Sequence, residues 1–169
     1  MLTTTGSKTM GFSEVSTLLW RERDALQLLL FKLVEEQLIV SAGHIRWLAH
    51  ANDEIEAALG QLRGTEVLRA AEVDVLADEL GLSAPPTLAE LAALAPEPWA
   101  TLFGEHRQAL LHLVAEVEGA TGHNRALLAA GARAVRQTLL SVAPTVQTYD
   151  SHGSAAATSN GPMLMDEQA

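Results

Sequence analysis

Apolar residues between Glu14 and Ala42 recur three and four positions apart, and this spacing limits the possible folds more than any other feature of the chain. One face of an α-helix repeats every 3.6 residues, so the pattern predicts a long helix over this range. Further apolar residues widen the face beyond one stripe, so the helix needs burial on more than one side. The stripe holds Val15, Leu18, Leu19, Leu26, Leu29, Leu30, Leu33, Val34 and Val40, and Leu28, Phe31, Leu38 and Ile39 widen it.

The composition also indicates an all-α protein. The 169 residues are 48% hydrophobic but only 4% aromatic, and alanine and leucine supply most of the apolar content. Both are good helix formers, and a chain of this length can bury one real core. We find no internal repeat and no strand pattern longer than four residues.

Glycines and prolines divide the chain into segments. Gly43 is expected to kink or break the first helix, and the sequence leaves open whether helices one and two are continuous. Helical spacing resumes to Leu62, and Gly64 is expected to be a second break, with Thr65 capping a further stretch to Leu80. Gly81 is placed as the residue that ends this stretch in a left-handed conformation.

A capping box opens the next segment. In Thr87-Leu88-Ala89-Glu90 the threonine and the glutamate have the spacing of reciprocal caps, and Pro96 ends the short helix. Another helix is expected over residues 99–118, followed by a joint at Gly119 and Gly122 and a final helix that Pro144 ends. Asn124 follows the joint and is a candidate cap for that helix, or a polar residue that fixes helix register inside the bundle.

The segments together predict an elongated antiparallel helical bundle with long N- and C-terminal helices and a short helical connector. We expect a flexible N-terminus over residues 1–12, with Ser13 capping the first helix, the bundle over residues 13–143 and a flexible tail over residues 144–169.

Charge and cysteine content exclude several classes of partner and site. The net charge is −10, which disfavours binding to nucleic acid or to an anionic membrane. The absence of cysteine excludes disulfides and thiolate metal sites. No apolar run approaches the roughly 20 residues needed to span a bilayer, and the N-terminus lacks the apolar core of a secretory signal. We therefore expect a cytoplasmic protein.

No motif for catalysis or for a metal or cofactor is present. No glutamate has a histidine three residues later, which is the signature of a di-iron bundle site. There is no Gly-x-Ser-x-Gly elbow and no phosphate loop. The acidic cluster of Asp53, Glu54 and Glu56 is interpreted as a solvated face, with Arg46 and His50 close enough to pair with Glu54. The sequence predicts a protein that is not an enzyme and has no cofactor.

The tryptophans and the final helix have both structural and functional interpretations. Trp20, Trp47 and Trp99 are expected to anchor the core, although one of them could line a groove for a partner helix. Leu128, Val135, Leu139 and Val142 form a stripe on the final helix. This stripe either packs against the chain's own bundle or receives an amphipathic helix of a client.

Three short motifs resemble a known family. The final helix begins Asn124-Arg125-Ala126-Leu127-Leu128, and the tail reads Tyr149-Asp150-Ser151-His152-Gly153. The connector holds Gly81-Leu82 and then Thr87-Leu88-Ala89-Glu90-Leu91. The chain thereby resembles the FlgN-like flagellar export chaperones, whose last long helix opens Asn-x-x-Asn-x-x-Leu-Leu and whose tail often holds a tyrosine followed by a glycine. Thr121 stands where the first asparagine of that motif is expected, so the chain departs from the motif there.

The resemblance implies a cytoplasmic chaperone that binds hook-associated proteins and delivers them to the type III export gate or its ATPase components. It implies that Asn124, Leu127, Leu128, Val135, Leu139 and Val142 bind the client and that Tyr149 contacts the gate. Three alternatives stay open: a structural helical protein that self-associates into a homo-oligomer through its first helix, a chaperone for another secretion client, and an enzyme of unknown type.

Overall fold

The computed structural model describes the backbone of residues 4–142 and the side chains of residues 10–141. Four α-helices follow one another, α1 (Thr4–Ser41), α2 (Leu48–Leu80), α3 (Leu88–Leu94) and α4 (Trp99–Val142), with the short 3₁₀ helix η1 (Ile45–Trp47) between α1 and α2. The fold class is all-α, as the sequence predicts. The chain divides into two compact units, Met1–Gly131 and Ala132–Ala169.

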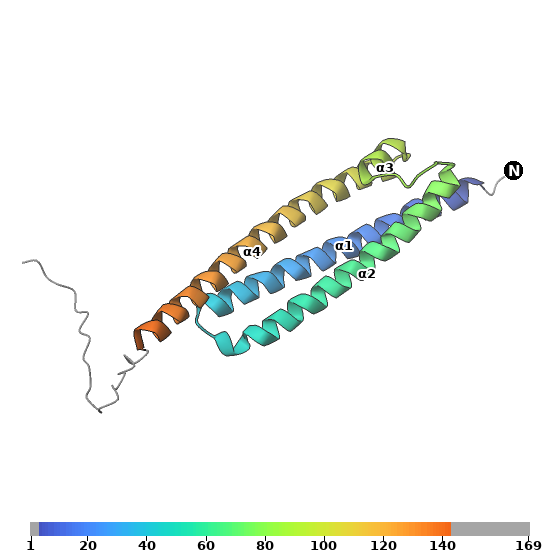
Figure 1. Ribbon diagram of the computed structural model, residues 1–169. Coiled ribbons are helices and arrows are strands. Elements are labelled where there is room, and N and C mark those ends of the chain that lie inside the picture. The colour runs from blue at the N-terminus through green and yellow to red at the C-terminus, as the bar shows by residue number, and fades with distance from the viewer. Residues whose placement is uncertain (1–3, 143–169) are drawn as a thin grey trace, which may run out of the picture. The chain divides into compact units, whose positions relative to one another are not determined.

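Side-chain contacts define the direction of each long helix in the first unit. Lys32 of α1 lies 2.9 Å from Glu54 of α2, and Glu22 pairs with Arg69, so the two helices run antiparallel. Ser16 lies beside His106 and Leu33 beside Asn124, so this part of α4 runs parallel to α1 and antiparallel to α2 (Figure 1). The long helices therefore alternate in direction along the chain, with α3 as the short connector.

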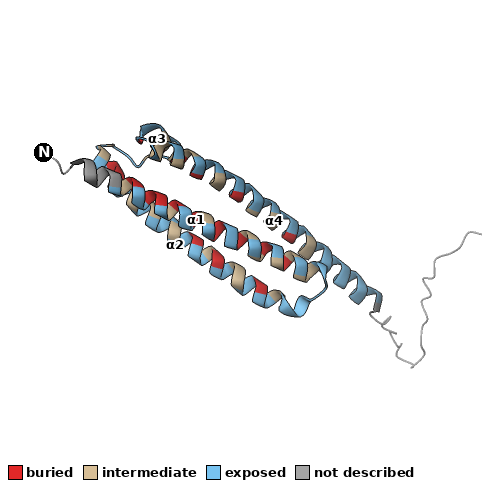
Figure 2. Ribbon diagram, turned by 180° about the vertical axis from the view of Figure 1, so that it is seen from behind, coloured by how far each residue is buried: buried red, intermediate tan, exposed pale blue. Residues whose placement is uncertain are grey.

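Two apolar clusters form the interior of the first unit. One joins α1, α2, α3 and the start of α4, and the stacked rings of Phe12, Trp99 and Phe103 belong to it or pack against it. The other lies further along the bundle, where α1 packs on α2 and α4. Figure 2 shows the buried residues as a repeated stripe on these helices. The buried members are Phe12, Val15, Leu19, Val73, Leu76, Leu91, Ala95 and Phe103, then Ala25, Leu26, Leu29, Leu33, Ala58, Leu62 and Leu113.

The ends of α2 and α3 follow the predicted local chemistry. Gly43 and Gly81 both have φ of +72°, a left-handed conformation that glycine adopts without strain. Gly81 is the C-terminal cap of α2, as predicted, and α1 ends before Gly43, so helices one and two are not continuous. The capping box of α3 is confirmed, because Thr87 and Glu90 cap each other's backbone N–H groups.

Three predicted boundaries are wrong. Helix α1 begins at Thr4 instead of after Ser13, and Phe12 is buried in the core. Gly64 lies inside α2, with the Thr65 hydroxyl donating to the Gln61 carbonyl within the helix instead of capping a new one. The expected joint at Gly119 and Gly122 is continuous α4, so Asn124 is not a cap. A glycine inside a helix costs only about 1 kcal/mol, which the burial of apolar residues on either side outweighs.

Candidate functional site

The apolar stripe of the last helix lies on α4, and its described residues range from half-buried to exposed. Leu127 and Leu128 are half-buried in the first unit. In the second unit, the side chains of Val135 and Leu139 are 61% and 66% exposed. Residues 129–141 are all exposed, and Figure 2 shows them pale blue. The side chain of Val142 and all of Tyr149 lie outside the described residues.

Asn124 is buried inside the first unit. Its side-chain amide donates to the backbone carbonyl of Leu33 and to the carboxylate of Glu36, both at 2.7 Å. Glu36 is itself buried, and the Asn124 carbonyl oxygen Oδ1 has no hydrogen-bond partner among the described residues. These contacts attach α4 to α1 at a fixed register, one of the roles that the sequence suggested for Asn124. A direct contact between Asn124 and a client requires the two helices to separate.

A second polar contact between α1 and α4 surrounds His106. This imidazole is fully buried, with Nε2 3.2 Å from the Ser16 hydroxyl and its ring packed edge-on against Trp20 at 5.0 Å. The Arg23 guanidinium stacks over the Trp20 ring, 4.3 Å from its centroid. Burial lowers the pKa of His106, and the positive charge of Arg23 lowers it further. Ser16 and His106 are both buried between α1 and α4, so the hydroxyl is enclosed by the bundle.

The acidic cluster of α2 is a surface ion-pair network. Glu54 pairs with Lys32 at 2.9 Å and with His50 at 3.4 Å, while Asp53 and Glu56 are exposed. The Lys32 hydrogen bonds to Glu35 and Glu54 raise the pKa of Lys32, and the Lys32 contact lowers that of Glu54. The predicted proximity of His50 to Glu54 is confirmed. Arg46 instead stacks on Trp47, 5.2 Å from its ring centroid.

The three tryptophans have different environments. Trp99 packs on the core cluster, as expected. Trp20 and Trp47 are about half exposed, at 50% and 51%, so the prediction that they anchor the core is wrong. Helix α1 also exposes Phe31, Val34 and Leu38, at 55%, 41% and 64%. Helical spacing alone did not separate these from the buried residues, because apolar residues occupy nearly the whole circumference of α1.

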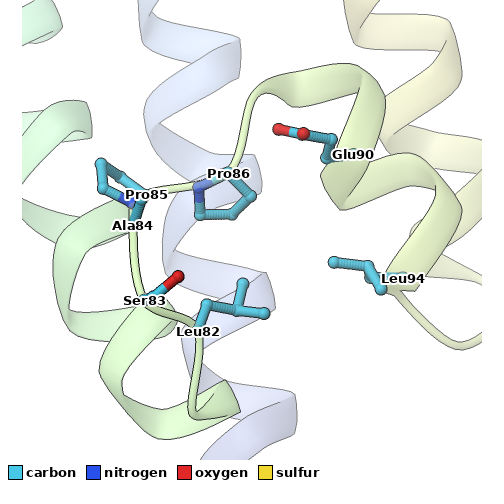
Figure 3. A pocket seen from close by; sticks show the side chains of 7 residues that line it. All are labelled: Leu82, Ser83, Ala84, Pro85, Pro86, Glu90 and Leu94. Carbon is cyan, nitrogen blue, oxygen red and sulfur yellow. The ribbon is translucent and has the colours of Figure 1, made fainter.

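A cavity of about 250 Å³ lies at the linker between α2 and α3. Figure 3 shows the side chains that line it, which are Leu82, Ser83, Ala84, Pro85, Pro86, Glu90 and Leu94. The one charged residue in the wall is Glu90, whose carboxylate accepts hydrogen bonds from the Thr87 amide and hydroxyl at 2.7 and 2.8 Å. These two bonds lower the pKa of Glu90. The carboxylate is therefore already used to cap α3.

The described residues hold no cluster of three or more His, Asp or Glu side chains suited to a metal ion. Among the described helices, none has both the length and the apolar character needed to cross a bilayer. The distinctive features of this part of the chain are an antiparallel bundle and an exposed apolar face on α4. These features define the class of all-α antiparallel bundle proteins with an exposed apolar helix face.

The family follows from comparison with known proteins. The model of the FlgN protein family matches residues 10–157, and the chain belongs to this family. Membership implies the role of a flagellar export chaperone and not that of an enzyme, in agreement with the sequence resemblance. No curated protein and no solved structure shows a significant match.

Sequence reasoning did not find the polar contacts between α1 and α4. Glu36 and Ser16 belong to no recognised motif, and each is one polar residue inside an apolar stripe. That position is itself a usable signal, because a polar residue on a buried face normally has a hydrogen-bond partner there. Asn124 and His106 occupy the matching positions on α4.

Proposed function

We propose that this chain is a cytoplasmic chaperone that binds hook-associated proteins and covers their amphipathic terminal helices before export. The observation that supports this most is the exposure of Val135 and Leu139 in the apolar stripe of α4. Family membership supports clients of this kind, and such helices are association liabilities while they are unassembled. Release at the type III export gate or its ATPase components would then uncover the client for assembly.

The proposed binding surface is the stripe of Leu127, Leu128, Val135, Leu139 and Val142 on α4. A client helix binds such a stripe by inserting its own apolar residues at positions three, four and seven apart. Asn124 is also among the predicted client-binding residues. Its burial supports a positioning role, in which its contact with Glu36 holds α4 against α1. Leu127 and Leu128 are half-buried in the first unit, and the exposure of Val135 and Leu139 in the second unit supports their accessibility to a client.

Binding of the client can be tested with the C-terminal segment of a hook-associated protein recovered with the tagged chain from native cytoplasm. We expect Leu139→Asp and the double variant Leu128→Asp with Leu139→Asp to abolish binding, because a charge would be desolvated in the interface. The control is Val67→Asp, which places the same charge on a residue of α2 that is 69% exposed. Unchanged affinity in the folded Leu139 variant would refute the proposed surface.

The tail provides the proposed contact with the export gate through Tyr149. This role rests on the family resemblance, since the residue lies outside the described part of the chain. We expect Tyr149→Ala to reduce export and gate binding while client affinity stays at the level of the unmodified chain. Tyr149→Phe is the matched control, which retains the ring and tests whether the hydroxyl is needed. Normal export by Tyr149→Ala would remove this assignment.

A second candidate function has a specific observation in its favour. The exposed Phe31, Val34 and Leu38 on α1 form an apolar surface that could join copies of the chain into a structural oligomer. A scaffold of this kind would sediment as a stable homo-oligomer and would ignore client segments. Phe31→Glu with Leu38→Glu would dissociate it, whereas the same pair of changes would leave a chaperone bound to its client through α4.

A further inference from the structure

The last part of α4 differs in charge from the rest of the chain. The net charge of the whole chain is −10, yet residues 119–142 contain Arg125, Arg133 and Arg136 and no aspartate or glutamate. Within the second unit, Arg133 and Arg136 are exposed on the same helix as Val135, Leu139 and Leu140. A basic segment in an acidic chain creates a local positive potential that can select a partner.

The two arginines lie beside the apolar stripe. In an α-helix successive residues are turned by about 100°, which places Arg136 next to Leu139 around the helix and Arg133 on the same flank. Neither guanidinium has an ion-pair or hydrogen-bond partner among the described residues. An arginine fork without an acceptor is suited to a carboxylate on a partner.

We propose that this face of α4, defined as Arg133, Val135, Arg136, Leu139 and Leu140, selects an amphipathic helix whose apolar face is flanked by glutamate or aspartate. The inference rests on the proposed chaperone function and adds the charge of the segment that the chaperone accepts. The arginines guide the approach and set the register of the bound helix, and the apolar residues supply most of the affinity. The net negative charge of the chain rejects acidic proteins elsewhere on its surface, so selection depends on this segment.

The test uses the full chain and two labelled synthetic helical peptides with the same apolar face. One peptide carries glutamates on the flanking positions and the other carries lysines. We expect the glutamate peptide to bind about tenfold more tightly at low ionic strength, and the preference to shrink as sodium chloride is added. Equal affinity for the two peptides would overturn the proposal.

Matched charge reversals locate the preference on the chain. Arg133→Glu with Arg136→Glu should remove it, because both attractions become repulsions. Arg63→Glu with Arg107→Glu changes the net charge by the same amount at two exposed arginines of α2 and α4 and should retain it. Equal loss in both double variants would show that only net charge matters, which would contradict the proposal. Circular dichroism on each variant verifies that the helices persist.

Two other occupants of this face give distinct results. Tight binding of the chain to anionic phospholipid vesicles, lost in Arg133→Glu with Arg136→Glu, would identify a membrane surface in place of a protein helix and would overturn the proposal. Binding of the glutamate peptide only after Asp166→Lys with Glu167→Lys would identify the chain's own acidic tail as the occupant, with the same consequence.

Failure of this inference can be distinguished from failure of the chaperone function. If a hook-associated client binds Arg133→Glu with Arg136→Glu as tightly as it binds the unmodified chain, but does not bind Leu139→Asp, the charge selection is wrong and the chaperone function stands. If no hook-associated segment binds the unmodified chain, the function itself fails. A loss of client binding in both variants supports both proposals.

Discussion

At the scale of single residues, the contact between Asn124 and Glu36 combines a structural role with the proposed site. We expect Asn124→Leu to lower the free energy of unfolding by about 2–3 kcal/mol, because Glu36 then stays buried without its hydrogen-bond donor. Urea denaturation measures this change. Adding Glu36→Leu to the same chain should recover most of the loss, since an apolar pair leaves no unsatisfied group. A double variant no more stable than Asn124→Leu would show that the contact does not behave as a pair.

His106 gives a pH-dependent prediction at the same scale. Burial, then the charge of Arg23, lowers its pKa below the ordinary value of 6.5, and Glu105 opposes this only in part. The unfolded chain therefore takes up a proton on His106 at a higher pH than the folded chain does. We expect the free energy of unfolding to fall as the pH drops below 6.5 and to stop falling once the folded histidine also titrates.

The variant His106→Gln keeps a hydrogen-bonding partner for Ser16. It should flatten the pH dependence of the free energy of unfolding. The exposed His112, which lies 3.1 Å from Glu116, is the control, and His112→Gln should leave the dependence on His106 in place. Thermal unfolding followed at several pH values provides the measurement. An unchanged pH profile in His106→Gln would show that another group controls it.

At the scale of the helices, three glycines test the boundaries directly. Gly64 and Gly119 lie inside α2 and α4, and a Cβ at either would meet no atom within 4 Å. We expect Gly64→Ala and Gly119→Ala each to raise stability by about 0.5–1 kcal/mol through helix propensity. Gly81→Ala should lower it by about 1 kcal/mol, because φ is +72° there. Chemical denaturation of the three variants is the measurement, and destabilisation by Gly64→Ala would favour a break in α2.

Much of the helical order follows from the sequence, because local rules determine it. Two helix caps depend only on backbone geometry within one turn. These are the Gly81 cap of α2 and the Thr87–Glu90 capping box of α3, and both are as predicted. The helices continue through Gly64, Gly119 and Gly122 because apolar residues are buried along the helix. A prediction that treats each glycine as a helix breaker does not include this burial. The burial of Asn124 and the exposure of Trp20 depend on partners distant in the sequence, so helical periodicity could not assign them.

At the scale of the whole molecule, the first unit contains the packed helices, and the described side chains of the second unit, residues 132–141, are exposed. The first unit has interior polar contacts at Ser16–His106 and Asn124–Glu36, and these fix how α4 packs on α1. The second unit contains the exposed side chains of Arg133, Val135, Arg136, Leu139 and Leu140, and its assignment to client binding stays a prediction. We therefore expect Asn124→Leu to lower the stability of the fold and Leu139→Asp to abolish client binding.

The most direct test of the chaperone function is sedimentation velocity on the chain alone and on its mixture with the C-terminal segment of a hook-associated protein. We expect the mixture to form a one-to-one complex that the Leu139→Asp variant does not form and the Val67→Asp variant does. A stable homo-oligomer of the chain that leaves the client segment unbound would contradict the chaperone function and favour a structural role.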